Sequence, residues 1–200
     1  MRSLRPRLPL ASLVLALALA LGAPGLGCSG IHHRTSFHDL NMDFGSIKNV
    51  AILPFWNMTQ NQGAADRVRD TLANALLATQ AVYVLPAGEV GRAMARASPA
   101  SSTSPSVEEI QKLGQLLKAD AVVTGVVREY GEVRSGNATS NVVSVSVQMY
   151  ETGTGKVIWS GSSTKGGVGW EDRLLGTGGG QPMNSVTEQV VDELLRQLFD

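Results

Sequence analysis

Hydrophobic residues are concentrated first in one stretch near the start of the chain. Residues 8–21 are nearly all Leu, Ala and Val, and the stretch ends in a Gly- and Pro-containing segment at 22–25. Arg2, Arg5 and Arg7 precede this stretch. A positive start, a short apolar core and small residues at the exit are typical of a cleaved signal peptide. The stretch is shorter than the roughly 20 residues that span a bilayer, and a retained membrane helix is the alternative.

Beyond the signal peptide, the spacing of apolar positions changes from segment to segment. The apolar run at 47–55 predicts a buried strand, and apolar residues three and four positions apart predict an amphipathic helix over 64–79. A shorter strand at 82–85 stops at Pro86, which can open a second helix. Ser106, with a glutamate three residues later, predicts a capping box at the start of a third helix.

The second half of the chain is dominated by strand patterns. Residues 120–130 are apolar on both faces and predict a central strand. Residues 143–149 alternate between apolar and polar side chains, which indicates a strand with one solvated face. A tight turn at 152–155 leads to a hairpin partner at 157–160. Apolar residues one turn apart over 184–199 predict a closing helix.

These elements follow the order β-α-β-α-α-β-β-β-α. The order predicts an α/β fold: a single sandwich of one mixed β-sheet with helices packed on it. No internal repeat and no second folded domain is indicated. We expect a signal peptide at 1–27, a lipidated N-terminus with a short flexible tether at 28–46, and a folded domain at 47–200.

Cys28 is the one cysteine of the chain and directly follows the predicted signal peptide. The sequence Leu26-Gly27-Cys28 resembles a lipoprotein processing site, although Gly25 stands where the usual pattern has Leu. We expect Cys28 to become the first mature residue and to carry lipid, each buried methylene contributing about 0.8 kcal/mol to anchoring. Ser29 at the next position implies sorting to the outer membrane. The alternative is ordinary secretion with Cys28 left as a free thiol.

The segment at 29–46 has few apolar residues, and their spacing is irregular. This pattern predicts a mobile linker. Its histidines, His32, His33 and His38, admit a metal site as an alternative, but zinc sites require a fixed geometry that a linker does not provide. We therefore expect a polar linker with no metal and no cofactor.

Charge and reactive side chains restrict the function classes. The chain has 17 basic and 17 acidic residues, and cleavage at residue 27 removes three of the basic ones. A mildly acidic mature chain argues against a nucleic-acid partner and against binding an anionic surface by charge alone. With Cys28 lipidated and all histidines in the tether, the domain has no His or Cys for acid–base or nucleophilic chemistry. We expect no enzymatic activity.

Large apolar residues next to a loop are the best candidates for contacts with a partner. Phe55, Trp56 and Met58 follow the first predicted strand, and such groups often anchor a protein partner. The alternative is that Phe55 and Trp56 cap the core. Trp170, in a glycine-rich segment, is a second candidate, whereas Trp159 alternates with Ile158 in a strand and is expected in the core.

Three segments together resemble one superfamily. They are VAILPF followed by Asn57 at 50–57, LG with ADAVVTG at 113–125, and ETG with KVIWS at 151–160. This series is similar to the superfamily that contains the curli secretion lipoprotein CsgG, the penicillin-binding-protein activator LpoB and the TolB N-terminal domain. The resemblance covers nearly all of residues 47–165. It implies a non-catalytic protein-binding domain outside the cytoplasm. Together with the lipoprotein signal, it leads us to expect a binding or assembly factor of the cell envelope, similar to penicillin-binding-protein activators or a secretion accessory factor, that is anchored in the outer membrane and faces the periplasm. Homo-oligomerisation stays open.

The same resemblance implies an alternative function as an oligomeric subunit of a CsgG-like secretion channel. Such channels insert two long amphipathic hairpins into this fold, and each membrane strand needs about 9–11 residues with one lipid-facing side. The candidate connection at 131–141 has only Val133 and Ala138 as apolar residues. We expect it to be too short and too polar to cross a bilayer. The tether is also much shorter than that of LpoB-like activators, which reach through the cell-wall layer. This length argues against their role and permits partners near the outer membrane.

Overall fold

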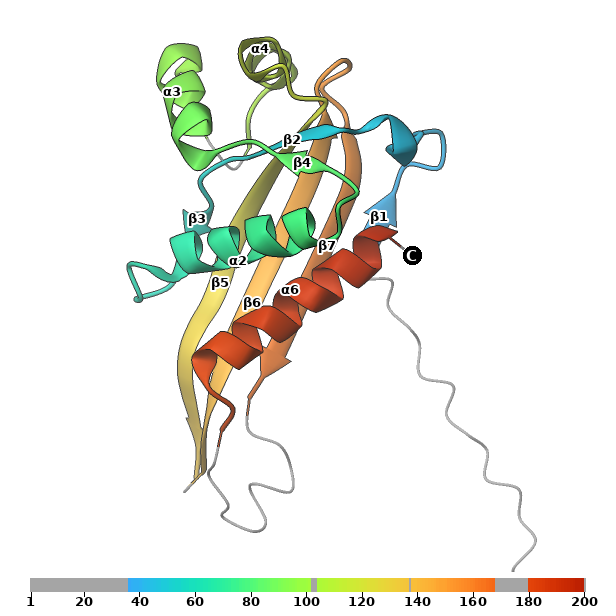
Figure 1. The fold of residues 1–200 in the computed structure, drawn as a ribbon. Coiled ribbons are helices and arrows are strands. Elements are labelled where there is room, and N and C mark those ends of the chain that lie inside the picture. Colours follow the sequence, from blue (N-terminus) through green and yellow to red (C-terminus); the bar gives the residue numbers. More distant parts are fainter. Residues whose placement is uncertain (1–35, 102–103, 137, 168–179, 200) are drawn as a thin grey trace, which may run out of the picture. The chain divides into compact units, whose positions relative to one another are not determined.

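The computed structural model describes residues 36–101, 104–136, 138–167 and 180–199. One open mixed sheet of seven strands has the order β1-β7-β6-β5-β2-β4, and β3 pairs with β5 beside this path. None of the helices in these ranges has the length and apolar character needed to cross a membrane. The predicted α/β fold with one mixed sheet is confirmed (Figure 1). The elements are β1 (Ser36–His38), η1 (Phe44–Ser46), β2 (Asn49–Ile52), β3 (Trp56–Asn57), α2 (Ala64–Ala78), β4 (Tyr83–Val84), α3 (Ala87–Ala97), α4 (Val107–Leu117), β5 (Ala121–Ser135), β6 (Ala138–Glu151), β7 (Val157–Gly166) and α6 (Met183–Phe199).

Strand β5 is central to the sheet. It runs parallel to β2 and β3 and antiparallel to β6, which in turn pairs antiparallel with β7. Parallel partners require long crossovers, and the chain between β2 and β5 contains three helices, whereas β5, β6 and β7 follow one another through short turns. Asp120 fixes the start of β5, because its Oδ2 accepts hydrogen bonds from the backbone N–H groups of Lys48 and Asn49 at 2.9 and 2.8 Å.

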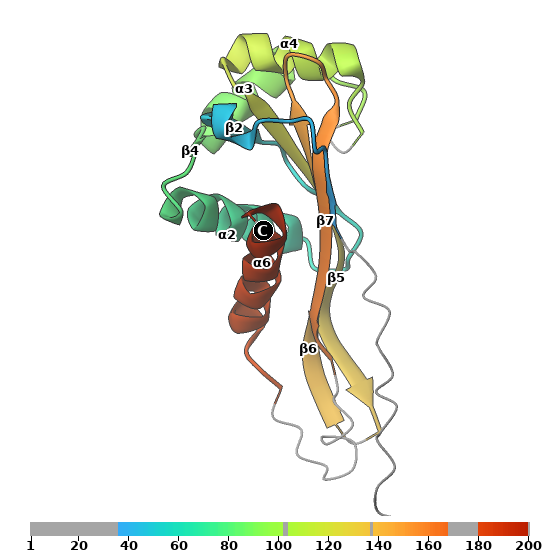
Figure 2. The same cartoon turned by 90° about the vertical axis from the view of Figure 1, so that its right-hand side faces the viewer.

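Helices α2 and α6 cover one face of the sheet (Figure 2). The alternation predicted for β6 is confirmed, since every second residue of its middle points to these helices and is buried. Both helices present a stripe of buried apolar residues at helical spacing, as their sequences predicted. The side chains that meet between the sheet and the two helices include Val68, Leu72 and Leu76 of α2, Val143, Val145, Val147 and Met149 of β6, and Val190 and Leu194 of α6.

Helices α3 and α4 form a second core at one end of the opposite face (Figure 2). The sheet contributes Ala51 of β2, Val122 of β5 and Tyr150 of β6 to this core, and Leu53 joins them directly after β2. They meet the apolar sides of both helices, which include Val90, Ala93, Ile110 and Leu113. Apolar residues on both faces of one end of β5 therefore place helices on both sides of the sheet there.

The capping box predicted at Ser106 is present at the start of α4. The Glu109 backbone N–H donates to Ser106 Oγ at 3.2 Å, and the Ser106 backbone N–H donates to Glu109 Oε2 at 2.7 Å. The other carboxylate oxygen of Glu109 accepts from the Ala100 backbone N–H at 2.8 Å. These backbone donors, Ser106 first, lower the pKa of Glu109 below its ordinary value of 4.5 because they favour the charged carboxylate.

The folded part begins earlier than predicted. Strand β1 pairs with the edge of β7, and η1 follows it. The His38 ring packs edge-on against Phe44 and Trp159, and its Nε2 lies 3.2 Å from the Leu198 carbonyl oxygen. The prediction of a flexible tether is therefore wrong for residues 36–46. The free edge of β7 accepts a short strand, and the aromatic contacts hold that strand in place although its sequence has no apolar alternation.

The segment at 131–141 is also more regular than predicted. Strands β5 and β6 stay paired to their ends, where Ser135 lies opposite Ala138. The segment is thus the far end of a hairpin, closed by a tight turn in which Gly136 has a φ of +62°. Apolar and polar residues alternate over 143–149 of β6 but not over 131–141. For this reason the sequence predicted a connection at 131–141 instead of paired strands.

Two glycines in neighbouring helices predict opposite effects of the same substitution. A Cβ at Gly114 in α4 would overlap the Thr152 side chain, so Gly114→Ala should lower the free energy of unfolding by about 1–3 kcal/mol. A Cβ at the exposed Gly91 in α3 meets no atom within 4 Å. Gly91→Ala should raise the free energy of unfolding by about 0.5–1 kcal/mol, because alanine favours a helix. Urea unfolding of both variants measures the difference, and effects of the same sign would contradict it.

The capping carboxylate predicts a pH-dependent contribution to stability. A lowered folded-state pKa means that the Glu109 charge stabilises the fold above the unfolded-state pKa. This contribution is lost as the pH falls through the lowered folded-state pKa. Glu109→Gln should therefore reduce the melting temperature at neutral pH, and the gap from the parent chain should close in acid. Glu132→Gln, which removes a charge from the exposed hairpin, is the control, and a gap for Glu109→Gln that does not change with pH would refute the assignment.

Candidate functional site

The part of the sheet beyond α3 and α4 has a face that carries no helix of the described residues (Figure 2). We call it the open face. It is the side of β5, β6 and β7 that points away from α2 and α6. Its side chains are mostly hydroxyl and amide groups, as the polar half of the β6 alternation predicted. They are Thr124, Val126, Arg128, Ser144, Ser146, Gln148, Ser160, Ser162 and Thr164.

Trp56 and Met58 stand at one edge of the open face. β3 pairs with β5 in a register that sets Trp56 beside Val126, and the Met58 backbone N–H continues this pairing by donating to the Val127 carbonyl oxygen at 2.9 Å. Because residues two apart point to the same side of a strand, Trp56 and Met58 share the open face. Their side chains are 57% and 63% exposed. The structure thus brings these two predicted binding residues together on the surface.

Phe55 points to the other side of the sheet. It is 7% exposed and belongs to the core under α2 and α6. Its ring lies so close to Gly125 that a Cβ there would come within 2.6 Å of it. Of the two roles considered for Phe55, the structure therefore supports core packing, and the side chain is not available to a partner. Cys28 and Trp170 lie outside the described residues.

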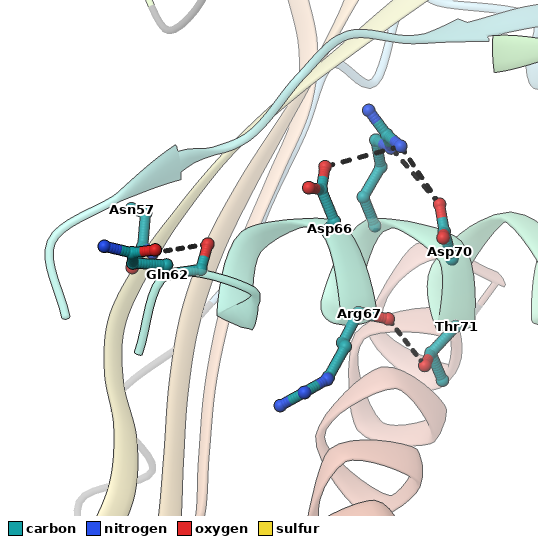
Figure 3. A network of polar contacts seen from close by, with 7 residues as sticks. Asn57, Gln62, Asp66, Arg67, Asp70 and Thr71 are labelled. Carbon is teal, nitrogen blue, oxygen red and sulfur yellow. Dashed lines mark hydrogen bonds and ion pairs between the residues drawn. The ribbon is translucent and has the colours of Figure 1, made fainter. Parts of the chain in front are cut away.

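The loop that carries Met58 is held by its own hydrogen bonds. Asn57 Nδ2 donates to the Gln62 carbonyl oxygen at 3.4 Å (Figure 3) and to the Asn61 carbonyl oxygen at 2.7 Å. Asn57 Oδ1 accepts from the Thr59 backbone N–H at 2.9 Å. This loop leads directly into α2. Asn57 thus fixes the loop beside Met58 from the side opposite the open face, which limits the entropy that a partner's binding would cost.

A shallow hollow of about 280 Å³ occupies the middle of the open face. Gln148 at its centre is oriented by Tyr150, whose hydroxyl donates to Gln148 Oε1 at 2.9 Å. Burial raises the pKa of Tyr150 above its ordinary value of 10.0, so this hydroxyl stays protonated and keeps its role as a donor. Further along, the Ser144 and Thr164 hydroxyls are 2.8 Å apart. The hollow is open to solvent, and hydrogen-bond donors and acceptors in and beside it are held in fixed positions.

Phe37 borders the open face at the opposite edge. β1 places it beside Ser160, which lines the hollow, and its side chain is 50% exposed. Phe37 was not predicted as a surface residue of the fold, because it lies in the segment predicted to be a flexible tether. The open face is thus a polar strip between Phe37 on one edge and Trp56 with Met58 on the other. Trp56 and Met58 can be buried by a macromolecular partner, and the polar strip beside them can form hydrogen bonds with it.

The open face does not hold a recognisable catalytic arrangement. Arg128 is the one charged residue among those that line the hollow. The serines of the hollow have no histidine or carboxylate beside them among the lining residues that could activate a hydroxyl. Across the ranges that the structure describes, there is no group of three or more His, Cys, Asp or Glu side chains that could hold a metal ion.

Comparisons with known proteins identify relatives of the fold. A family model described as "Putative lipoprotein GNA1162-like" matches residues 43–197. No curated protein matches the sequence. The chain is similar to the PelC dodecamer structure from Paraburkholderia phytofirmans, with 19% identity, a TM-score of 0.52, and coverage of 82% of this chain and 94% of that chain. This similarity shows a shared fold.

Two further solved structures are similar at a lower TM-score. One is lipoprotein GNA1162 from Neisseria meningitidis, with 22% identity, a TM-score of 0.49, and coverage of 76% of this chain and 97% of that chain. The other is the LpoB C-terminal domain from Escherichia coli, with 17% identity, a TM-score of 0.45, and coverage of 63% of this chain and 88% of that chain.

Proposed function

Because the chain belongs to the GNA1162-like family, we propose that it is a lipid-anchored, non-catalytic factor of the bacterial envelope that binds another protein through its open face. The family description supports the lipid anchor, and the exposed side chains support the binding function. In the proposed arrangement Cys28 carries the lipid in the outer membrane, and the domain faces the periplasm. The resemblance to CsgG, LpoB and the TolB N-terminal domain is consistent with a binding or assembly factor of this kind.

One observation carries the binding proposal: Trp56 and Met58 are largely exposed beside a sheet face that no described helix covers. Burying apolar surface contributes about 25 cal/mol per Å², so covering these side chains would favour association. Aromatic anchors often dominate the binding energy of protein interfaces. The hydroxyl and amide groups of the hollow would then set the orientation of the partner through hydrogen bonds.

The short distance between the anchor and the fold restricts where a partner can be. Seven residues separate Cys28 from Ser36, where the described structure begins. Fully extended, this connection reaches at most about 30 Å. We infer that the partner is a membrane protein or a periplasmic protein close to the lipid surface.

Substitution of the exposed anchors should remove the partner while leaving the fold intact. Trp56→Ala and Met58→Ser change side chains that lie mostly in water, so the melting temperature should stay close to that of the parent chain. In a crosslinking pull-down from envelopes, Trp56→Ala should reduce recovery of the partner at least about tenfold, because truncated anchors typically cost more than 1.4 kcal/mol. Trp170→Ala tests the second aromatic candidate in the same way.

Tyr83→Ala provides the matched control for this experiment. Tyr83 is an aromatic residue with 54% exposure, but it lies in β4 at a different edge of the sheet. It should leave recovery unchanged. Equal recovery with the Trp56 variant and with the Tyr83 variant would refute the open face as the binding surface.

The same pull-down separates two kinds of partner. A captured protein of different sequence supports an assembly factor. Rings that contain only this chain and survive detergent would instead support the alternative of a secretion-channel subunit or another homo-oligomer. The similar PelC structure is described as a dodecamer, which is the reason to look for such rings.

The anchor itself is tested at Cys28. Cys28→Ala removes the lipid acceptor, and the chain should then move from the membrane fraction to the soluble periplasmic fraction. Mass spectrometry of the parent chain should show a lipid-modified cysteine at its first residue. An unmodified Cys28, or equal membrane partitioning of the variant, would contradict the proposal. Ser29→Ala, which keeps the acceptor, is the control for effects of substitution at the processing site.

A further inference from the structure

A second apolar surface lies where β1 and the end of α6 come together (Figure 1). We call it the terminal patch, and it consists of Phe37, Leu40 and Phe199. Their side chains are 50%, 95% and 52% exposed. Together with Met42, Phe44 and Leu198, they line an open hollow of about 880 Å³. Three large apolar side chains on one surface exceed the scattered apolar residues that are normal on a soluble protein.

The conformation of a tight turn explains the exposure of Leu40. Leu40 lies in a turn that is closed by a hydrogen bond of 3.2 Å from the Met42 backbone N–H to the Asp39 carbonyl oxygen. The Asp39 carboxylate accepts from the Asn41 backbone N–H at 2.9 Å and holds the same turn. The turn thus presents a leucine almost entirely to solvent, and no side chain of the described fold covers it.

The position of the patch in the chain indicates what covers it. Phe37 is nine residues from Cys28, and nine residues reach at most about 32 Å even when fully extended. With Cys28 in a lipid surface, the patch is confined to the immediate neighbourhood of that surface. Tethering of this kind gives a high effective concentration, so even a weak apolar contact becomes occupied. A freely diffusing partner has no such advantage.

We propose that the terminal patch inserts into the phospholipid surface that carries Cys28, which makes it a second membrane contact. This inference rests on the lipid anchor of the proposed function. Asp39 and Asp43 adjoin the patch, and each carboxylate is engaged by a backbone N–H in its own turn. The two carboxylates place negative charge near the membrane contact and would repel an anionic headgroup. A zwitterionic lipid such as phosphatidylethanolamine is therefore the lipid that we expect at the patch.

Two contacts would orient the domain where one contact cannot. A single point of attachment at Cys28 does not by itself fix the orientation of the domain relative to the lipid surface. Insertion of the terminal patch fixes the β1 end of the sheet at the membrane, and the hairpin end of β5 and β6 lies at the other end of these strands (Figures 1 and 2). The edge of the open face that carries Trp56 would then be held away from the lipid and accessible to a partner.

Site-specific fluorescence of the lipidated mature chain tests the orientation. Lipidation blocks the thiol of Cys28, so a nitrobenzoxadiazole label reacts only with a cysteine introduced by Leu40→Cys or, as the control, by Val133→Cys in the hairpin. Both positions are exposed, so the labels should not disturb the fold. In vesicles of phosphatidylethanolamine and phosphatidylcholine, the label at position 40 should shift to the blue and lose most of its quenching by iodide. The label at position 133 should remain fully quenched.

The outcomes distinguish this inference from the proposed function. If Cys28 carries no lipid by mass spectrometry, the proposed function fails and the inference fails with it. If Cys28 is lipidated but the label at position 40 is quenched as strongly as the label at position 133, the inference alone is overturned. Protection of position 40 that grows with protein density in the membrane would show that a second copy covers the patch and would also overturn it. Protection that is independent of density, and that decreases when anionic lipid is added, supports it.

Discussion

The structure depends on the pairing of β5 with strands of opposite direction on its two sides. Its first half contributes Ala121 and Val123 to the core under α2 and α6, and Val122 to the core under α3 and α4. The parallel pairing with β2 and the antiparallel pairing with β6 both start at this double-sided half. Without β5, each of the two cores would therefore lose the residues that the central strand contributes to it. Asp120 secures the arrangement by joining the start of β5 to the backbone just before β2 and at its start.

The open face follows from a change of pattern within the same strand. After Val123 the residues that point away from α2 and α6 become Thr124, Val126 and Arg128, and β6 presents Ser146 and Gln148 beside them. A further helix would have to bury these polar groups, and burying them without partners is costly. The fold therefore leaves this region uncovered. Thr124 is the exception, since it is 2% exposed at the border with the second core.

The sequence alone predicted the elements that have local causes. The Ser106 capping box, the stripes of α2 and α6 and the alternation of β6 each depend on residues a few positions apart. The parts it could not predict depend on distant pairing. β1 is three residues long and exists because β7 has a free edge and Trp159 accepts the His38 ring. The separation of Phe55 from Trp56 depends on the register of β3 against β5, which decides which neighbour points to the core. From the apolar character of Phe55 and Trp56 alone, either residue could have packed in the core or contacted a partner.

The two apolar surfaces differ in their surroundings, and this difference fits the separate contacts proposed for them. Trp56 and Met58 border a polar hollow whose hydrogen-bonding groups are fixed by Tyr150 and by the pairing of the strands, which favours a partner with a defined structure. Leu40 and Phe199 border a hollow lined mainly by further apolar side chains, which suits a fluid apolar phase that has no fixed hydrogen-bonding pattern to match. Because β1 joins both surfaces through Phe37, the orientation of the terminal patch at a membrane also determines the orientation of the open face. A chain with a longer connection to its anchor would lose this coupling, since the patch would no longer be confined near the lipid.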